Sequence, residues 1–165
     1  MSRPAPPTVT RFDLSRYLGT WYEIARLPMR YEPPDYTDVS ATYSLEADGS
    51  VRVQNRAYDG KGELQESIGQ ARPLDASDDS RLEVTFLPEG LRWIPFTKGD
   101  YWVLRVDTDY RTALVGSPDY TFLWLLHREA TLDATTRDAF LATARGLGYD
   151  LSKLIQTPHT GRRTA

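Results

Sequence analysis

The chain of 165 residues contains no cysteine, and this absence removes several functions at once. Disulfide bonds, thiolate metal sites and cysteine nucleophiles are all excluded. Histidine is also scarce, because only His127 and His159 are present and no histidine cluster can hold a catalytic metal. The sequence therefore predicts neither a metal site nor a cofactor.

Long apolar runs and a surplus of basic residues are missing as well. The longest apolar stretch, residues 122–126, has the length of a strand, whereas a membrane-spanning helix needs roughly 18 apolar residues. Residues 1–8 lack the apolar core of a signal peptide. Twenty basic and 23 acidic residues give a net charge of −3, which excludes the basic excess of a nucleic-acid binder. We expect a soluble chain and leave its compartment open between the cytoplasm and a periplasmic or membrane-peripheral location after removal of a signal.

Short apolar segments, separated by turn-forming residues, make up most of the chain before residue 129. In residues 39–45, apolar and polar residues alternate, which is the pattern of a half-buried strand. Asp48-Gly49 is a hairpin signal. Most links are short, and short links join antiparallel neighbours. Eight strands are predicted, at residues 19–28, 39–45, 51–55, 64–72, 82–86, 101–107, 113–116 and 121–128.

One helix is predicted after these strands. Asp133 is a suitable N-cap, an apolar stripe includes Phe140 and Ala144, and Gly148 ends the helix. The strands at 101–106 and 121–126 are apolar on both faces, so one face lines an interior and the other receives the helix. The fold class is therefore all-β: an eight-stranded antiparallel up-and-down β-barrel with one C-terminal α-helix packed outside. We expect residues 1–11 to form a disordered arm, 12–156 the barrel domain and 157–165 a flexible tail.

The residues that alternation directs inward differ widely in size. Large Phe86 and Trp124 share the interior with small Ala25 and Ala113, and polar Asn55 joins them. An eight-stranded barrel can be filled by side chains or can hold one small ligand. A mixture of this kind favours a cavity with a few placed polar groups, and a solid core is the alternative.

Three motifs carry a resemblance to a known family. They are Gly19-Thr20-Trp21 on the first strand, Thr108-Asp109-Tyr110 between the sixth and seventh strands, and Arg128 at the end of the eighth. Together they resemble the lipocalin family over roughly residues 12–155. Segments such as Ala41-Thr42-Tyr43-Ser44-Leu45 are most similar to the branch of bacterial outer-membrane lipoprotein lipocalins, plant temperature-induced lipocalins and apolipoprotein D. The lipidated cysteine of the bacterial lipoproteins and the disulfides of apolipoprotein D have no counterpart here.

The resemblance implies a structural role for the signature residues. It places Trp21 as a plug at the closed end of the barrel, with Arg128 lying across its ring. We expect this group to hold the barrel shut and to touch no ligand. Its members are Gly19, Trp21, Thr108, Asp109, Tyr110 and Arg128.

Alternation from an inward Trp21 predicts the ligand-binding residues. On strand 64–72 the direction is left open, because Leu64 and Ile68 favour one face and Gly69 and Ala71 the other. The resemblance to apolipoprotein D supports Tyr43, Asn55 and Trp124. The full predicted set is Ala25, Val39, Ala41, Tyr43, Val53, Asn55, Val84, Phe86, Tyr101, Val103, Phe122 and Trp124.

Two charged residues, Glu23 and Arg105, fall on the same predicted inner face. A buried charge without a partner costs several kcal/mol, so we expect the two to be linked low in the barrel. The alternative is that Arg105 pairs with the carboxylate of a fatty acid.

The connection at residues 88–98 is unusually apolar. It contains Trp93, Ile94 and Phe96 beside two basic residues, and alternate links of the barrel place it at the open mouth. These residues suggest contact with a membrane surface or a gate over the ligand. A lid folded inward is the alternative.

The function predicted from these observations is binding, storage or transport of a small hydrophobic ligand, a fatty acid or lysophospholipid-like lipid. We expect no catalysis, because His127 points outward and His159 lies in the polar tail, so an inward nucleophile has no base. The alternative function is a non-catalytic interaction module that uses the apolar mouth loop. The sequence leaves open whether the protein is a monomer or a dimer.

Overall fold

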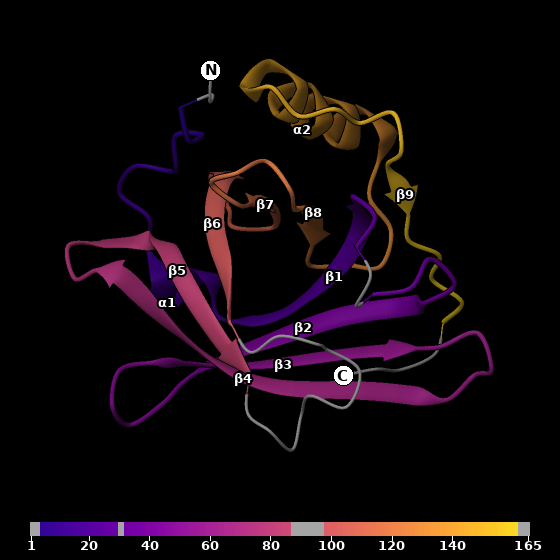
Figure 1. Ribbon diagram of the computed structural model, residues 1–165, viewed down its shortest axis with the longest axis horizontal. Helices are drawn as coiled ribbons and strands as arrows, with labels where there is room; N and C mark the ends of the chain where they lie inside the picture. Colours follow the sequence, from indigo (N-terminus) through magenta and orange to yellow (C-terminus); the bar gives the residue numbers. More distant parts are fainter. Residues whose placement is uncertain (1–3, 30–31, 87–97, 162–165) are drawn as a thin grey trace.

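A computed structural model describes residues 4–29, 32–86 and 98–161 of the chain. Eight antiparallel strands close into a barrel, and helix α2 lies outside it (Figure 1). This architecture confirms the predicted fold class. Within the described residues, the elements are α1 (Leu14–Tyr17), β1 (Gly19–Arg26), β2 (Thr37–Leu45), β3 (Val51–Tyr58), β4 (Leu64–Asp75), β5 (Asp78–Phe86), β6 (Lys98–Val106), β7 (Thr112–Gly116), β8 (Leu123–His127), α2 (Ala134–Leu147) and β9 (Ile155–Gln156).

The register between β3 and β4 settles the direction that the sequence left open. Val51 lies opposite Ala71, and Val53 lies opposite Gly69. Ala71 is buried in the inner core, whereas Leu64 is 49% exposed. The face with Gly69 and Ala71 therefore points inward. Residues 73–80, which lie between two of the predicted strands, are themselves mostly strand, because a tight turn joins β4 and β5 directly.

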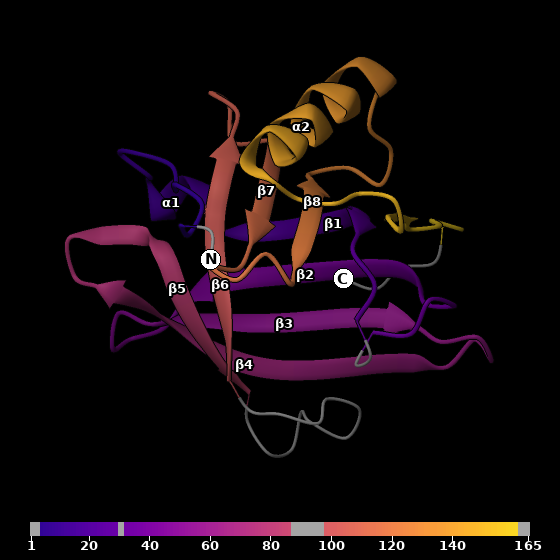
Figure 2. The same cartoon turned by 45° about the horizontal axis from the view of Figure 1, so that its top comes forward.

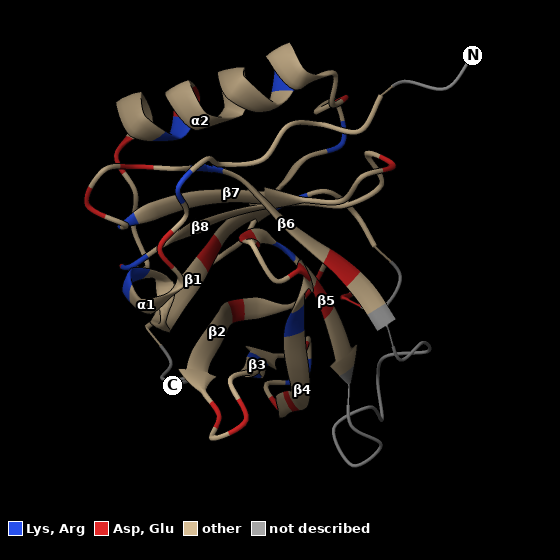
Figure 3. Ribbon diagram, turned by 90° about the vertical axis from the view of Figure 1, so that its left-hand side faces the viewer, with Lys and Arg blue, Asp and Glu red and all other residues tan. Residues whose placement is uncertain are grey.

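Helix α2 forms as predicted and covers one side of the barrel. The carboxylate of Asp133 accepts a hydrogen bond from the backbone N–H of Thr136, and Gly148 ends the helix with a left-handed φ of 113°. Phe140 and Ala144 are buried in an outer core shared with β7 and β8. Figures 2 and 3 show α2 lying over this side, with β2–β5 forming the opposite side of the barrel.

The N-terminal segment is more ordered than the sequence suggested. Within the segment predicted as a disordered arm, the backbone N–H of Val9 donates to the carbonyl of Val103, and Pro6 is fully buried. In the structure, this segment therefore packs on the barrel at Pro6 and Val9. The short helix α1, which the sequence analysis missed, then brings Tyr17 onto Trp21 with ring centres 4.7 Å apart.

The seam between β1 and β2 has an unusual construction. The first half of β1 pairs with β2, but the second half pairs with β8 and β9 instead. Residues 155–160, here called the C-terminal strap, bridge the two strands. In the strap, Thr157 donates its N–H to the carbonyl of Ile24, and the carbonyl of Pro158 accepts from the N–H of Asp38. Residues 157–160, predicted as part of a flexible tail, thus complete this wall in the structure.

Candidate ligand cavity

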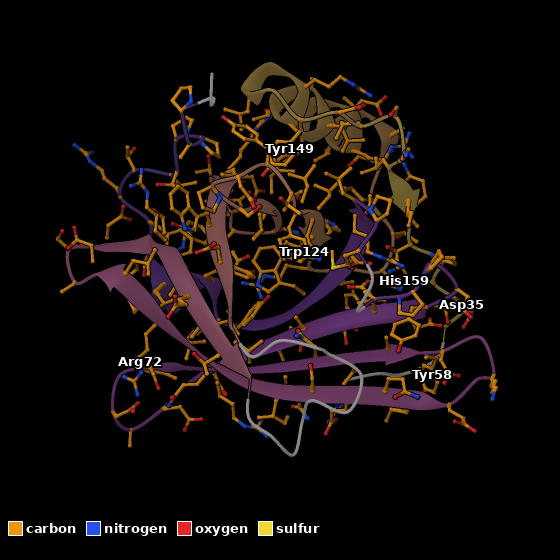
Figure 4. All side chains as sticks on the ribbon, in the orientation of Figure 1. Asp35, Tyr58, Arg72, Trp124, Tyr149 and His159 are labelled. Atoms are coloured by element: carbon orange, nitrogen blue, oxygen red, sulfur yellow. The ribbon has the colours of Figure 1, made fainter. Side chains whose placement is uncertain are left out.

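The barrel encloses a cavity of about 140 Å³ whose wall is mostly apolar. Trp124 and Phe122 lie on one side of it, with stacked rings whose centres are 5.8 Å apart. Figure 4 shows Trp124 directed into the interior. The lining consists of Glu23, Met29, Glu32, Val39, Ser40, Ala41, Tyr43, Val53, Asn55, Arg56, Ala57, Val84, Gly99, Asp100, Tyr101, Phe122, Trp124 and Leu126.

Most of the predicted ligand-binding residues are among those that line the cavity. They are Val39, Ala41, Tyr43, Val53, Asn55, Val84, Tyr101, Phe122 and Trp124. Val103 faces inward but is completely buried in the core and does not reach the cavity. The side chain of Phe86 lies outside the described part of the structure, although its backbone pairs with Gly69.

Ala25 is placed differently from its prediction. The pairing of β1 with β8 shifts register between Glu23 and Ala25, so the inward alternation is interrupted there. Ala25 joins the outer core beneath α2, and Arg26 becomes completely buried instead. Ala25 therefore does not line the cavity.

The expected link between Glu23 and Arg105 is also wrong. A register shift in β6 between Val103 and Arg105 turns Arg105 outward, toward α2. Its guanidinium donates to the hydroxyl of Thr143 at 2.8 Å and lies 4.1 Å from the ring centre of Phe140. Arg105 therefore fastens the helix to the barrel and does not face the cavity.

Glu23 instead belongs to a buried charged cluster with Arg26 and Glu32. The Nη1 and Nε atoms of Arg26 lie 2.9 Å from Glu23 and 3.0 Å from Glu32, respectively. The strap contributes Thr157, whose hydroxyl donates to Glu23 at 2.5 Å. Burial, followed by the negative charge of Glu23, raises the pKa of Glu32 well above its usual value, although Arg26 opposes the shift. This cluster forms the polar edge of the cavity near the seam.

Three tyrosines form a hydrogen-bonded layer on the other side of the cavity. The hydroxyl of Tyr101 lies 2.6 Å from that of Tyr17 and 2.8 Å from that of Tyr43. Burial raises the pKa of all three hydroxyls, so they stay protonated. This layer separates the cavity from the Trp21 end of the barrel, and the sequence analysis did not identify it as a unit.

The signature residues gather at the closed end. Gly19 has φ of 104°, and Arg128 lies against Trp21. The carbonyl of Thr108 accepts a hydrogen bond from Arg16, and the hydroxyl of Tyr110 accepts one from the N–H of Asp13. Asp109 belongs to the same turn between β6 and β7. None of the six lines the cavity of the described structure.

The two histidines lie away from the cavity. His127 is hydrogen-bonded to the hydroxyl of Thr112. His159, labelled in Figure 4, is not in a free tail as expected, because its Nε2 atom lies 2.7 Å from the carbonyl oxygen of Glu23. In the described ranges, no three residues of the kind that bind metals come together, and no helix is long and apolar enough to cross a membrane. Trp93, Ile94 and Phe96 lie outside the described residues.

Comparisons with known proteins agree with this geometry. The Lipocalin-like domain family matches residues 12–159. Temperature-induced lipocalin-1 of Arabidopsis thaliana is 41% identical over 92% of this chain and 82% of its own length. Outer membrane lipoprotein Blc of Escherichia coli K12 is 41% identical over 97% of this chain and 89% of its own. Insecticyanin from the tobacco hornworm Manduca sexta superposes with a TM-score of 0.73 at 23% identity, covering 96% of this chain and 86% of that one, which supports the fold alone.

Proposed function

Because the chain belongs to the lipocalin family, we propose that its barrel binds the apolar part of a fatty acid or lysophospholipid-like lipid. Binding of small hydrophobic ligands is general in this family, and its members are generally carriers and not enzymes. The observation that supports the proposal here is the apolar cavity inside the barrel, between Trp124 and the strands β2 and β3. Apolar walls with a few polar groups are typical of such sites.

The size of the cavity limits how much of a ligand it can enclose. Ligand pockets usually measure about 300–1,000 Å³, whereas an engineered cavity of roughly 150 Å³ holds benzene. The cavity of about 140 Å³ therefore accommodates a ring or a short length of acyl chain. A longer ligand must extend through the mouth or displace the stacked rings of Phe122 and Trp124.

Tryptophan fluorescence tests the proposal, because Trp124 lines the cavity. Titration with fatty acids, lysophospholipids and steroids should change the emission of the parent protein. The change should be largely lost in Trp124→Phe, whereas Trp102→Phe, which removes a tryptophan of the outer core, should keep it. A flat response to every probe, with no lipid detected by mass spectrometry of the purified protein, overturns the proposal and favours the interaction module.

Membrane contact is a separate part of the proposal and rests on the sequence of residues 88–98. Trp93, Ile94 and Phe96 can insert into the headgroup region, with Arg92 and Lys98 beside them. One relative is an outer membrane lipoprotein, which supports the same proposal. Co-sedimentation with anionic liposomes should fall when these three residues are replaced by serine. Equal pelleting of parent and variant overturns membrane contact and leaves the binding proposal intact.

A further inference from the structure

The tyrosine layer carries an inference about the chemistry of the ligand. Tyr101 is the middle member, and its hydroxyl is hydrogen-bonded to those of Tyr17 and Tyr43 at 2.6 and 2.8 Å. Tyr43 and Tyr101 line the cavity, whereas Tyr17 lies on the far side, stacked on Trp21 and only 2% exposed. The layer therefore forms a polar part of the cavity wall, through Tyr43 and Tyr101.

Counting hydrogens shows that the layer has one donor too many. Each protonated phenol carries one hydrogen, so three hydroxyls offer three donors. The two bonds within the layer use two of them. In the part of the chain that the structure describes, the third hydrogen has no protein acceptor. One hydroxyl must therefore donate to something other than these residues or remain unsatisfied.

The position of the spare hydrogen follows from burial. If Tyr17 carried it, a fully buried donor would be left without an acceptor, which is unfavourable. In the other two arrangements, the hydrogen belongs to Tyr43 or to Tyr101, and both of these line the cavity. In both of these arrangements the spare donor belongs to a side chain that a ligand in the cavity can reach.

The charges around the cavity decide what kind of acceptor is suitable. Among the described lining residues are the carboxyl groups of Glu23, Glu32 and Asp100, and the guanidinium of Arg56 is hydrogen-bonded to Glu66. Arg26 lies between Glu23 and Glu32 and is already paired with both. A ligand carboxylate buried at the tyrosine layer would therefore lose its hydration without gaining an unpaired cation among the described residues, whereas an uncharged carbonyl loses much less hydration.

We propose that the tyrosine layer is a recognition site for an uncharged carbonyl oxygen, such as that of a ketone or an ester, at the buried end of an apolar ligand. The inference rests on the proposed function, because the ligand must first enter the cavity. It narrows that function, since a purely hydrocarbon end leaves the spare hydrogen unused and a carboxylate end loses its hydration without a cationic partner among the described residues.

Matched small probes test this directly. Acetophenone and ethylbenzene share a phenyl ring and a two-carbon substituent, and benzoate supplies the anionic comparison. Calorimetric titration gives the ratio of the acetophenone and ethylbenzene affinities for each protein. In Tyr43→Phe/Tyr101→Phe, which has no hydroxyl of the layer at the cavity, the ratio should fall roughly five- to tenfold relative to the parent. Ethylbenzene should still bind both proteins.

The control variant is Tyr17→Phe. It removes one hydroxyl of the layer, but the remaining pair, Tyr43 and Tyr101, still has two hydrogens for one bond and keeps a donor at the cavity. Its affinity ratio should stay within about twofold of the parent. The single variants Tyr43→Phe and Tyr101→Phe should each keep part of the preference, because one cavity hydroxyl remains in each.

A spectroscopic measurement protects the test against variants that do not fold. In the parent, the carbonyl stretching band of bound acetophenone should lie at lower frequency than in hexane, because the oxygen accepts a hydrogen bond. A band at the hexane position, or benzoate binding more tightly than acetophenone, overturns the inference while ethylbenzene binding still supports the proposed function. Failure of all three probes to bind the parent overturns both.

Discussion

The guanidinium carbon of Arg128 lies 3.8 Å from the ring centre of Trp21. The indole N–H of Trp21 in turn donates to the carbonyl of Tyr17 at 2.7 Å. The nitrogens of Arg128 also donate to four backbone carbonyls, those of Arg16, Leu18, Thr20 and Tyr110. One side chain therefore ties α1, the start of β1 and the turn before β7 into a single closed end.

Replacing Arg128 should weaken the whole barrel. Arg128→Ala should lower the free energy of unfolding by about 2–4 kcal/mol, because four carbonyls and one aromatic ring lose a cationic partner. Arg128→Lys should recover only part of this, since lysine lacks the planar fork. Urea unfolding measures both. Arg137→Ala, at an arginine that is paired with the exposed Asp138, should change stability by less than about 0.5 kcal/mol. Equal losses in Arg128→Ala and Arg137→Ala would contradict this role.

Replacing Arg105 should affect stability without affecting ligand binding. Arg105→Ala should cost about 1–2 kcal/mol in urea unfolding, because α2 loses the bond at Thr143 and the contact with Phe140. Ligand affinity, measured by tryptophan fluorescence, should stay within about twofold of the parent, since Arg105 does not line the cavity. A large fall in fatty-acid affinity in a folded variant would contradict this and show that Arg105 contributes to ligand binding.

The buried cluster at the seam should make stability depend on pH. The pKa of Glu32 is raised above 4.5 in the folded state, first by burial and then by Glu23. Between the unfolded and folded pKa values, the folded protein therefore holds a proton that the unfolded chain has lost. This contribution to stability is complete below about pH 4.5 and declines as the pH rises toward the folded pKa.

Glu32→Gln isolates this effect, because glutamine remains neutral at every pH. The free energy of unfolding of the variant, minus that of the parent, should increase as the pH is raised from about 5 to 8. Subtraction cancels the other carboxyl groups, such as Asp48, whose pKa is lowered to about 2 by bonds from Ser50 and Arg72. Exposed Glu63→Gln serves as the control. A difference that stays constant with pH would show that Glu32 does not titrate in this way.

Gly116 should not tolerate a side chain. A Cβ atom there would overlap the hydroxyl of Tyr149 and lie 2.9 Å from Leu104. That hydroxyl donates to the carbonyl of Phe122 at 3.0 Å and helps to hold the segment after α2 on the barrel (Figure 4). Gly116→Ala should cost about 1–3 kcal/mol. Gly146→Ala, in open space on α2, should be neutral or stabilising by up to about 1 kcal/mol. Thermal unfolding of both variants measures the contrast, which disappears if the site can repack.

The sequence predicted those parts of the fold that are determined by residues close together in the chain. Alternation in residues 39–45 depends only on which side of the strand is buried, and β2 forms there. Asp133 and Gly148 end α2 through their own hydrogen bonding and backbone freedom. Helix α1 and strand β9 were missed because each is too short to show a period, and their stability comes from contacts made elsewhere in the chain.

The prediction of which residues line the cavity failed where a register shift reverses the alternation of a strand. From Ser40 onward the register of β2 with β3 is regular, and Ala41, Tyr43, Val53 and Asn55 all line the cavity as predicted. On β1 and β6, a shift of register reverses the alternation, which misplaced Ala25 and Arg105. Such a shift has no signature in composition. The available hint was Arg26, a charge three residues after Glu23 on a strand expected to be buried.

The C-terminal strap has a consequence for how the protein is made. The seam that it closes lies between β1 and β2, which leave the ribosome more than a hundred residues before residues 155–160. During that interval Arg26 lacks Thr157, and Asp38 lacks its partners in the strap. A nascent chain can pair most of its strands, but the seam between β1 and β2 stays open until the C-terminal strap has been synthesised.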